Sequence, residues 1–456
     1  MSTVGRRLAA LVAVLSLVVV GCGGVGGDGD EQQQAGGDEG TVSGTLSTFG
    51  FSLPDEIATT RVDTFKKAYP KVQVKITEGG FDEQQFLSAV ASGAPPDLVY
   101  VDREIIGTYA ARGAIQPLDD CISQAQIDMG QYRPAAVQQV TVDGKVYGIP
   151  EFYSVRVLMT NTQAVKEAGL SPSDVDTTDW SKLPGLAEDL TVTKGGKLQR
   201  IGFDPKIPEF LPMWVKANGG ALLSDDGKTA QLNDPKVVEA LTTTAGIVKA
   251  DGGWNKLKSL RDSFDFFGAK NQFAKDQLGA FPMEDWYLNV LAEASPDVDL
   301  SVTPFKDRQG NPLTFVTGSA WAIPKGAKNP AAACRFAKTM TEASTWVAAA
   351  KARSAARAKK NLPFTGLYSG NKVADEQVFG QVYKPSGNAK FDDAVQTVLG
   401  VQDVAFATPP SPAGAEFQKA WQDAVNRVLA GQMEPAAALE RAQREAQAAL
   451  DKAAGG

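Results

Sequence analysis

The stretch VQVKITEGGFDEQQFLSAVASGAPPDLVYV (residues 72–101) predicts a strand, a helix and a second strand in direct succession. Apolar and polar residues alternate over 72–76, as they do in a half-buried strand. Residues 82–92 suit a helix that ends at Gly93, and the apolar run 98–101 is typical of a central parallel strand. Because a helix joins the two strands, the stretch predicts an α/β fold with an open, mainly parallel sheet.

Neighbouring segments extend this alternation of strands and helices. A short strand is expected at 44–47, an amphipathic helix at 56–68 and a further helix at 105–111. In such sheets, ligands bind beyond the carboxyl ends of the strands. Ligand contacts are therefore expected at Phe49, after the first strand, and at Asp102 and Arg103, after the strand at 98–101.

The first 22 residues have the pattern of an export signal. Arg6 and Arg7 precede an apolar run over 8–20, which is too short to span a bilayer, since spanning needs about 20 residues. Residues 1–21 are predicted to be a signal peptide. The small residue Gly21 followed by Cys22 resembles the end of a bacterial lipobox, in which the cysteine carries acyl chains that anchor the protein. The alternative is an ordinary signal peptide with Cys22 unmodified.

Residues 22–40 are rich in glycine and almost free of apolar side chains. Such a segment cannot bury enough surface to offset its ordering entropy, so we expect a lipidated N-terminus followed by a flexible linker. With the lipid anchor, this places the folded part at the outer face of the cell membrane.

Composition excludes several classes of function. The formal net charge of −7 becomes −9 without the signal peptide, which holds two arginines and no acid. An acidic chain argues against nucleic acid as a partner. Histidine is absent from the sequence, which excludes Ser-His-Asp and Cys-His catalysis and histidine-bound zinc, and no metal or cofactor is expected.

The roughly 400 residues after the linker are more than a single hydrophobic core normally accommodates, so two lobes are predicted.

Cys121 and Cys334 are the only cysteines besides Cys22. In an oxidising exterior, two such cysteines form a disulfide more often than they stay free. The alternative is that both are buried and unpaired, because free cysteine is among the most buried residue types.

Motifs along the chain carry a family resemblance. They include FKKAYPKVQVKI (65–76), DGKVYGIP (143–150), GAFPMEDWYL (279–288) and VLAGQMEPAAALERAQREAQAAL (428–450). In order and spacing these resemble the extracellular solute-binding proteins of bacterial ABC importers, in the carbohydrate-binding group that includes maltose-binding protein. The resemblance covers nearly all of the chain after residue 41.

The resemblance implies two α/β lobes with a ligand cleft between them. The N-terminal lobe is expected to comprise 41–149 and 305–344, and the C-terminal lobe 150–304 and 345–456. Cys121 and Cys334 then fall in one lobe. The resemblance also implies a monomer without catalytic activity, which binds a small-molecule ligand, a sugar or oligosaccharide, and delivers it to a membrane permease.

Several side chains are expected in the cleft. Trp286 follows Glu284 and Asp285 where the family commonly has Gly-Pro before a stacking tryptophan, so its neighbours depart from the pattern. The alternative to ligand contact is packing in the core for Trp286 and Trp321, and capping of a helix N-terminus for Asp102. The ligand-binding residues implied by the resemblance are Phe49, Asp102, Arg103, Tyr153, Arg156, Phe210, Trp214, Asp285, Trp286, Ser319 and Trp321.

Two other functions remain open from the sequence. One is a secreted lipoprotein glycosidase that uses paired carboxylates, such as Glu151 and Asp285. The other keeps the fold and binds a phosphorylated polyol or a peptide. Arg103 and Arg156 together in the cleft would favour an anionic ligand, whereas aromatic residues with few cations would favour a neutral sugar.

Overall fold

The computed structural model of the chain describes residues 42–455. The predicted signal peptide, Cys22 and the linker lie outside these residues, so the expectations about them stay predictions. Within the described range, no helix combines the length and the apolar composition that crossing a bilayer requires.

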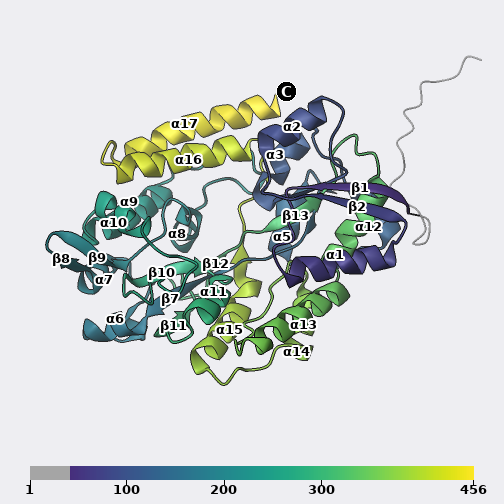
Figure 1. The fold of residues 1–456 in the computed structure, drawn as a ribbon. Coiled ribbons are helices and arrows are strands. Elements are labelled where there is room, and N and C mark those ends of the chain that lie inside the picture. The colour runs from purple at the N-terminus through teal and green to yellow at the C-terminus, as the bar shows by residue number, and fades with distance from the viewer. Residues whose placement is uncertain (1–41, 456) are drawn as a thin grey trace, which may run out of the picture. The chain divides into compact units, whose positions relative to one another are not determined.

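The first lobe is built on a five-stranded sheet in the order β2-β1-β3-β13-β6 (Figure 1). β1 pairs in parallel with both β2 and β3, and β13 is antiparallel to β3 and β6. Residues 72–101 therefore form β2, α2 and β3, and β1 lies between β2 and β3 in the sheet. The strands are β1 (Gly44–Phe49), β2 (Val72–Thr77), β3 (Leu98–Asp102), β6 (Ile149–Pro150) and β13 (Ser319–Ala322).

Helices flank this sheet, and local sequence explains where they begin. Asp55 caps α1 by accepting a hydrogen bond from the Ala58 amide at 3.0 Å, and Asp82 caps α2 in the same way through Gln85. Burial of Ile57, Val62 and Phe65 directs one face of α1 into the core. The helices are α1 (Glu56–Ala68), α2 (Glu83–Ala91), α3 (Ile106–Ala111), α4 (Asp119–Ala125), α5 (Pro134–Val140) and α12 (Pro330–Thr341).

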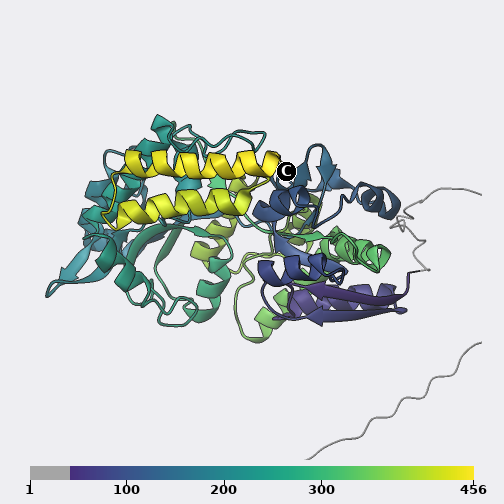
Figure 2. The same ribbon diagram turned by 90° about the horizontal axis from the view of Figure 1, so that it is seen from above.

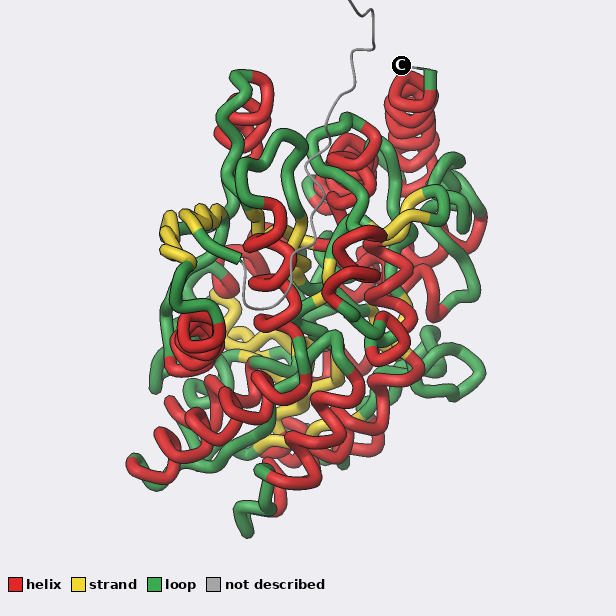
Figure 3. The backbone as a smooth tube through the Cα atoms, turned by 90° about the vertical axis from the view of Figure 1, so that its right-hand side faces the viewer, coloured by secondary structure: helices red, strands yellow, loops and turns green. Residues whose placement is uncertain are grey.

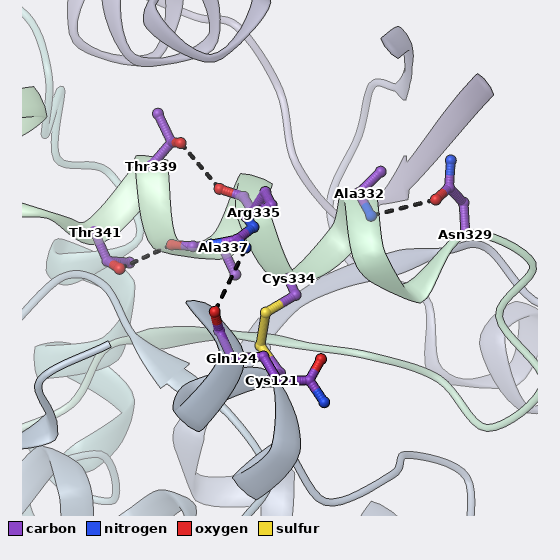
Figure 4. Close-up of a disulfide and its surroundings, with 9 residues drawn as sticks. All are labelled: Cys121, Gln124, Asn329, Ala332, Cys334, Arg335, Ala337, Thr339 and Thr341. Atoms are coloured by element: carbon purple, nitrogen blue, oxygen red, sulfur yellow. Dashed lines mark hydrogen bonds between the residues drawn. A yellow bond between two sulfur atoms is a disulfide. The ribbon is translucent and has the colours of Figure 1, made fainter. Parts of the chain in front are cut away.

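A disulfide joins Cys121 on α4 to Cys334 on α12 (Figure 4). Both cysteines are buried, and Arg335 beside the bridge donates to the Gln124 carbonyl at 3.5 Å. The bridge connects residues 213 positions apart within one lobe. Movement of the lobes relative to each other would therefore leave it intact.

The second lobe is built on the sheet β11-β7-β10-β9-β8. β7 is antiparallel to β11 and β10, and of the neighbouring pairs in this sheet only β10 and β9 run parallel. The α/β class is confirmed, but the expectation of mainly parallel sheets is wrong. β13 and β7 enter their sheets directly from the other lobe and so run against their neighbours. The strands are β7 (Arg156–Asn161), β8 (Val192–Lys194), β9 (Lys197–Phe203), β10 (Leu278–Glu284) and β11 (Leu300–Thr303).

Helices also flank the second sheet (Figure 1). Figure 3 faces the right-hand side of Figure 1 and shows helices, in red, over much of the surface of that side. α16 and α17 lie side by side and contact α9 (Figure 2). α15 packs against β11 of the same lobe. The helices are α6 (Thr162–Glu167), α7 (Leu183–Leu190), α8 (Leu211–Ala217), α9 (Pro235–Ala250), α10 (Trp254–Arg261), α11 (Tyr287–Ala294), α15 (Ala389–Val401), α16 (Gly414–Leu429) and α17 (Pro435–Ala454).

α13 (Ala343–Lys359) and α14 (Lys372–Gln381) differ from the expected lobe boundary. The boundary at 344/345 assigned both to the C-terminal lobe, yet Trp346 of α13 shares a hydrophobic cluster with Ile57 of α1. Burial of Trp346 against α1 holds this part of the chain on the first lobe. The far end of α13 reaches the second lobe, where Arg357 donates to the Asn289 carbonyl at 3.1 Å.

Short elements complete the connections between the lobes. Ser154 and Thr317 exchange backbone hydrogen bonds of 3.0 and 3.2 Å where two of the crossing segments run together. The remaining elements are β4 (Thr141–Val142) with β5 (Lys145–Val146), β12 (Thr314–Phe315) with β14 (Ala405–Phe406), and 3-10 turns at Arg103–Ile105, Met129–Gln131, Pro172–Asp174 and Gln402–Val404.

Candidate ligand-binding site

A cavity of about 190 Å³ lies where elements of both lobes meet. The 3-10 turn after β3, the start of β7, the start of α8, the end of β10 and the first turns of α16 all contribute to its wall. It is lined by Glu104, Arg156, Glu209, Phe210, Pro212, Leu223, Glu284, Phe315, Thr317, Thr408, Pro409, Ser411, Gly414, Phe417, Gln418, Trp421 and Gln422.

Arg156 is a buried polar group of this wall and is only 4% exposed. One guanidinium nitrogen donates to the carbonyls of Ser154 at 3.0 Å and Phe315 at 3.1 Å, and the other donates to the Glu284 carboxylate at 3.2 Å. Its Nε has no hydrogen-bond partner among the described residues. The side chain is therefore held rigidly and keeps one unused donor.

The pairing of Arg156 with Glu284 follows from strand register. The two residues lie opposite each other where β7 and β10 pair antiparallel. Opposite charges directly across a strand pair attract one another. Sequence reasoning missed Glu284 as a site residue because it expected parallel strands, which would not place these two positions together.

The cavity is acidic. Three glutamates and one arginine line it, which gives a formal charge of −2. Burial raises the pKa of the Glu104 carboxyl, and the nearby Arg156 partly opposes that shift. Glu209 is exposed, with a carboxylate oxygen 3.8 Å from Arg261. Carboxylates accept strong hydrogen bonds from hydroxyl or ammonium groups.

Aromatic and amide side chains complete the wall. The rings of Phe210 and Phe315 each lie 5.0 Å from the Arg156 guanidinium carbon. Phe417 and Trp421 lie one turn apart on the buried face of α16, with Gln418 beside them. Flat apolar surface next to donors and acceptors suits a sugar ring, which has C–H faces and a rim of hydroxyls.

Among the residues expected from the sequence, Arg156 and Phe210 line this cavity. Asp102 and Ser319 lie together elsewhere, at the edge of the first sheet, where Ser319 Oγ donates to the Asp102 carboxylate at 3.1 Å. Asp102 precedes a 3-10 turn but makes no side-chain capping bond. Phe49 ends β1 and packs edge-on against Phe81. Their role in binding stays a prediction.

Arg103 and Tyr153 are buried between the crossing segments and do not line the cavity. Arg103 is fully buried and donates to Gln139 at 2.9 Å and to the carbonyls of Phe152 and Ser319. Burial lowers the pKa of Arg103 to about 10. Tyr153 is 2% exposed, and its ring lies 5.2 Å from the Arg133 guanidinium. Both side chains stabilise the crossing.

Trp214 and Trp321 are core residues, and their assignment as ligand contacts is wrong. Trp214 is fully buried, donates to the Pro205 carbonyl at 2.9 Å and packs edge-on against Phe305. Trp321 is fully buried and donates to the Glu151 carboxylate. Each indole N–H thus has a partner in the interior, which is how buried tryptophan is normally accommodated.

Asp285 and Trp286 follow β10 beyond the cavity wall. Asp285 is 2% exposed, and burial raises its pKa to about 8. Trp286 is half-buried, and the ring of Phe267 stacks on it at 6.1 Å with an interplanar angle of 16°. Phe267 itself is 69% exposed. Trp286 therefore belongs to a partly exposed aromatic cluster, and its contact with a ligand stays a prediction.

Glu151, the other carboxylate of the glycosidase alternative, is fully buried. It forms a 2.8 Å ion pair with Arg61 and accepts from Trp321. A carboxyl group enclosed in this way cannot reach a glycosidic bond. The anionic-ligand alternative required Arg103 and Arg156 together in the cleft, but Arg103 is buried elsewhere and Arg156 is paired with Glu284.

The chain forms two α/β lobes, each with a sheet of mixed strand direction, and crosses between them several times. A polar and aromatic cavity lies where the lobes meet, which is the architecture of a two-lobe binding protein. The model of the bacterial extracellular solute-binding protein family matches residues 60–365. The chain belongs to this family, as the sequence motifs predict.

Two curated relatives illustrate the match. The arabinooligosaccharide-binding protein of Bacillus subtilis is 22% identical over 340 residues, which cover 72% of this chain and 73% of the relative. A maltooligosaccharide ABC transporter solute-binding lipoprotein of Streptococcus pneumoniae is 24% identical over 309 residues, covering 62% of this chain and 65% of the relative.

Solved structures share the fold. CpMnBP1 with mannotriose bound has a TM-score of 0.71 and 25% identity, and the match covers 89% of this chain and 100% of that one. An ABC substrate-binding protein of Listeria monocytogenes in complex with cycloalternan has a TM-score of 0.71 and 20% identity, covering 90% and 99%. The two-lobe architecture inferred from the motifs is thereby confirmed.

Proposed function

We propose that this chain is the substrate-binding component of an ABC importer for a carbohydrate. The observation that carries the proposal is the cavity around Arg156, where the guanidinium pairs with Glu284 and the lining includes the aromatic residues Phe210 and Trp421. Donors and acceptors suit the hydroxyl rim of a sugar, and the rings suit its C–H faces. Family relatives named for oligosaccharides support the same class of ligand.

The protein acts by binding and not by catalysis. Sugar binding draws the lobes together, with the few residues where the chain crosses between them absorbing the change. The captured sugar then passes to a membrane permease. Burial of both Glu151 and Asp285 supports this view over a glycosidase, because neither carboxyl group lies in the cavity wall.

The proposal includes a monomer tethered by lipid at Cys22 to the outer face of the cell membrane, with 22–40 as its linker. The word lipoprotein in the name of the Streptococcus pneumoniae relative supports this tether. Two acyl chains would anchor the protein stably, where one binds only marginally. Replacing Cys22 with alanine should release soluble protein, and unchanged membrane attachment would contradict the tether.

Further ligand contacts are proposed outside the cavity wall. Phe49, Asp102 and Ser319 lie at the edge of the first sheet, and Trp286 with Phe267 forms the aromatic cluster beyond β10. These positions would contact additional rings of a longer saccharide.

A saccharide panel tests the proposal. The soluble chain from residue 23 is screened by thermal unfolding against mono- and oligosaccharides, and bound sugar is then analysed by mass spectrometry. A ligand at a hundredfold excess over its Kd should add about 2.7 kcal/mol of stability. The sugar should be recovered unchanged. Stabilisation by no saccharide, or recovery of a cleaved one, would contradict the proposed function.

A further inference from the structure

The lining of the cavity carries an imbalance of charge. Glu104, Glu209 and Glu284 come from three separate elements, namely the 3-10 turn after β3, the segment before α8 and the end of β10. Arg156 is the only cation among the described residues that line the cavity. The convergence of three carboxylates on one cavity from distant parts of the chain is therefore a property of the site and not of a local acidic run.

Arg156 does not compensate all three carboxylates. Its guanidinium already serves Glu284 at 3.2 Å and two backbone carbonyls. Arg261 lies behind Glu209 at 3.8 Å, but its other nitrogen is committed to Asp204. Lys206 lies 5.8 Å from the Phe210 ring and is absent from the lining. Glu104 has no ion-pair partner within 4.0 Å among the described residues, so negative charge remains uncompensated.

We infer that the ligand carries a protonated amine, and specifically that the site takes an amino sugar. The inference rests on the proposed function, since it adds a charge to a ligand already taken to be a saccharide. An ammonium group has three donors and forms charge-assisted bonds with carboxylates, which are about twice as strong as neutral ones. Phe417 and Trp421 are among the lining residues, and aromatic rings attract both a sugar ring and a cation.

Two features of the wall agree with this ligand. Arg156 lines the cavity, is only 4% exposed and has an Nε without a hydrogen-bond partner among the described residues; a sugar hydroxyl is an acceptor of the kind that this donor lacks. Burial also raises the pKa of the Glu104 carboxyl, and the nearby Arg156 opposes that shift. A positive charge bound near Glu104 would favour the ionised form of this carboxyl group.

Matched pairs of sugars test the inference by isothermal titration calorimetry. Glucosamine is compared with glucose, galactosamine with galactose, mannosamine with mannose, and chitobiose with cellobiose. At least one amine should bind, and each amine that binds should do so roughly tenfold or more tightly than its hydroxyl partner. Equal or tighter binding of the neutral member overturns the inference and leaves the proposed function standing.

Spermidine separates the amine from the sugar. If spermidine binds and no saccharide does, both the inference and the proposed function fail. If no amine binds while neutral sugars do, the inference alone fails. Binding of an amino sugar without binding of spermidine supports both.

A charge variant locates the effect. Glu104→Gln should lower the preference for the amine over its hydroxyl partner roughly tenfold, because the variant keeps a hydrogen-bonding group but loses the charge. Glu209→Gln serves the same purpose at an exposed position, where folding is not at stake. Glu188→Gln, on an exposed face of α7, is the matched control and should leave the preference unchanged. An unchanged preference in both test variants would overturn the assignment to this cavity.

Discussion

Arg103 and Arg156 occupy comparable places in the two lobes, one directly after β3 and the other at the start of β7. Both are more than nine-tenths buried. Arg103 donates to Gln139 and to carbonyls of the crossing segments, whereas Arg156 donates to the carboxylate of Glu284 in the cavity wall. From residue type and position next to a strand, the sequence predicts a ligand contact equally for both arginines. The partners of Arg103 indicate that it stabilises the fold, and those of Arg156 support the proposal that it binds the ligand.

Removing Arg103 should have the largest effect on stability. Arg103→Ala takes the guanidinium donor away from the Gln139 side-chain oxygen and the Phe152 carbonyl, at about 1–3 kcal/mol for each group, while the Ser319 carbonyl keeps its bond from the Glu151 amide. We expect the free energy of unfolding in urea to fall by roughly 3–5 kcal/mol. Affinity measured on the remaining folded protein should change little. Normal stability with lost binding would reverse the roles of the two arginines.

Besides the hydrogen bonds of Arg103, the disulfide stabilises the first lobe, and the described residues of the second lobe contain no disulfide. Replacing Cys121 and Cys334 with serine opens a loop of more than 200 residues; the chain-entropy limit for closing such a loop is about 5 kcal/mol, and the loss expected for a typical disulfide is about 2–4 kcal/mol. Unfolding in urea should detect that loss, with sugar affinity retained. A large loss of affinity in the folded double variant would show that the bridge also shapes the cavity.

Trp286 tests how far the binding surface extends beyond Arg156. If it stacks on a sugar ring, Trp286→Ala should lower affinity by about 2–3 kcal/mol, a roughly 30- to 150-fold change, with little loss of stability. If it mainly supports the fold, the free energy of unfolding should fall by about 3–5 kcal/mol instead. Val192→Ala, at an exposed position of β8 in the same lobe, is the matched control and should change neither affinity nor stability much.

Arg156 should show the opposite balance from Arg103. Arg156→Gln removes a charge-assisted donor from the cavity wall, and we expect affinity to fall by about 1.5–3 kcal/mol. Arg156→Lys keeps the charge but loses the planar fork, so its affinity should be intermediate. Calorimetry gives the affinities, and urea unfolding gives the stability of each variant. Affinity equal to that of the unchanged protein would remove Arg156 from the site.

Two buried acids extend the comparison to pH. Burial raises the pKa of both carboxyl groups; Glu151 forms an ion pair with Arg61, whereas Asp285 has no ion-pair partner within 4.0 Å among the described residues and its pKa is raised to about 8. The unfolded chain releases the Asp285 proton near pH 4 and the folded chain near pH 8, so this group makes stability fall as pH rises between those values. Asp285→Asn should flatten this slope in urea unfolding. An unchanged slope would show that Asp285 is ionised in the fold.

Local patterns in the sequence predicted the strands at 72–76 and 98–101 and the helices around them, because alternation and caps depend on neighbouring residues. The antiparallel entry of β7 and β13 could not be predicted in this way, since strand direction depends on which lobe the chain comes from. The pairing of Glu284 with Arg156 depends on that direction and was missed with it.

The tryptophans show a second limit. Trp214 and Trp321 stand beside turns and strand ends, where ligand contacts were expected, yet both face the core. Periodicity locates the buried face of an element but does not distinguish a core from a cleft, since both are lined by aromatic residues. Arg156 and Phe210 were found because they lie where the family places its ligand, and the acidic members of the cavity wall had no comparable local signal.

A crystal structure with a saccharide from the binding panel tests the central claim most directly. The account predicts a sugar ring in the cavity, with hydroxyl oxygens within hydrogen-bond distance of Arg156 and Glu284 and a ring face against Phe210 or Trp421. A sugar bound only at the Asp102–Ser319 edge or only on Trp286, without contact to Arg156, would contradict it.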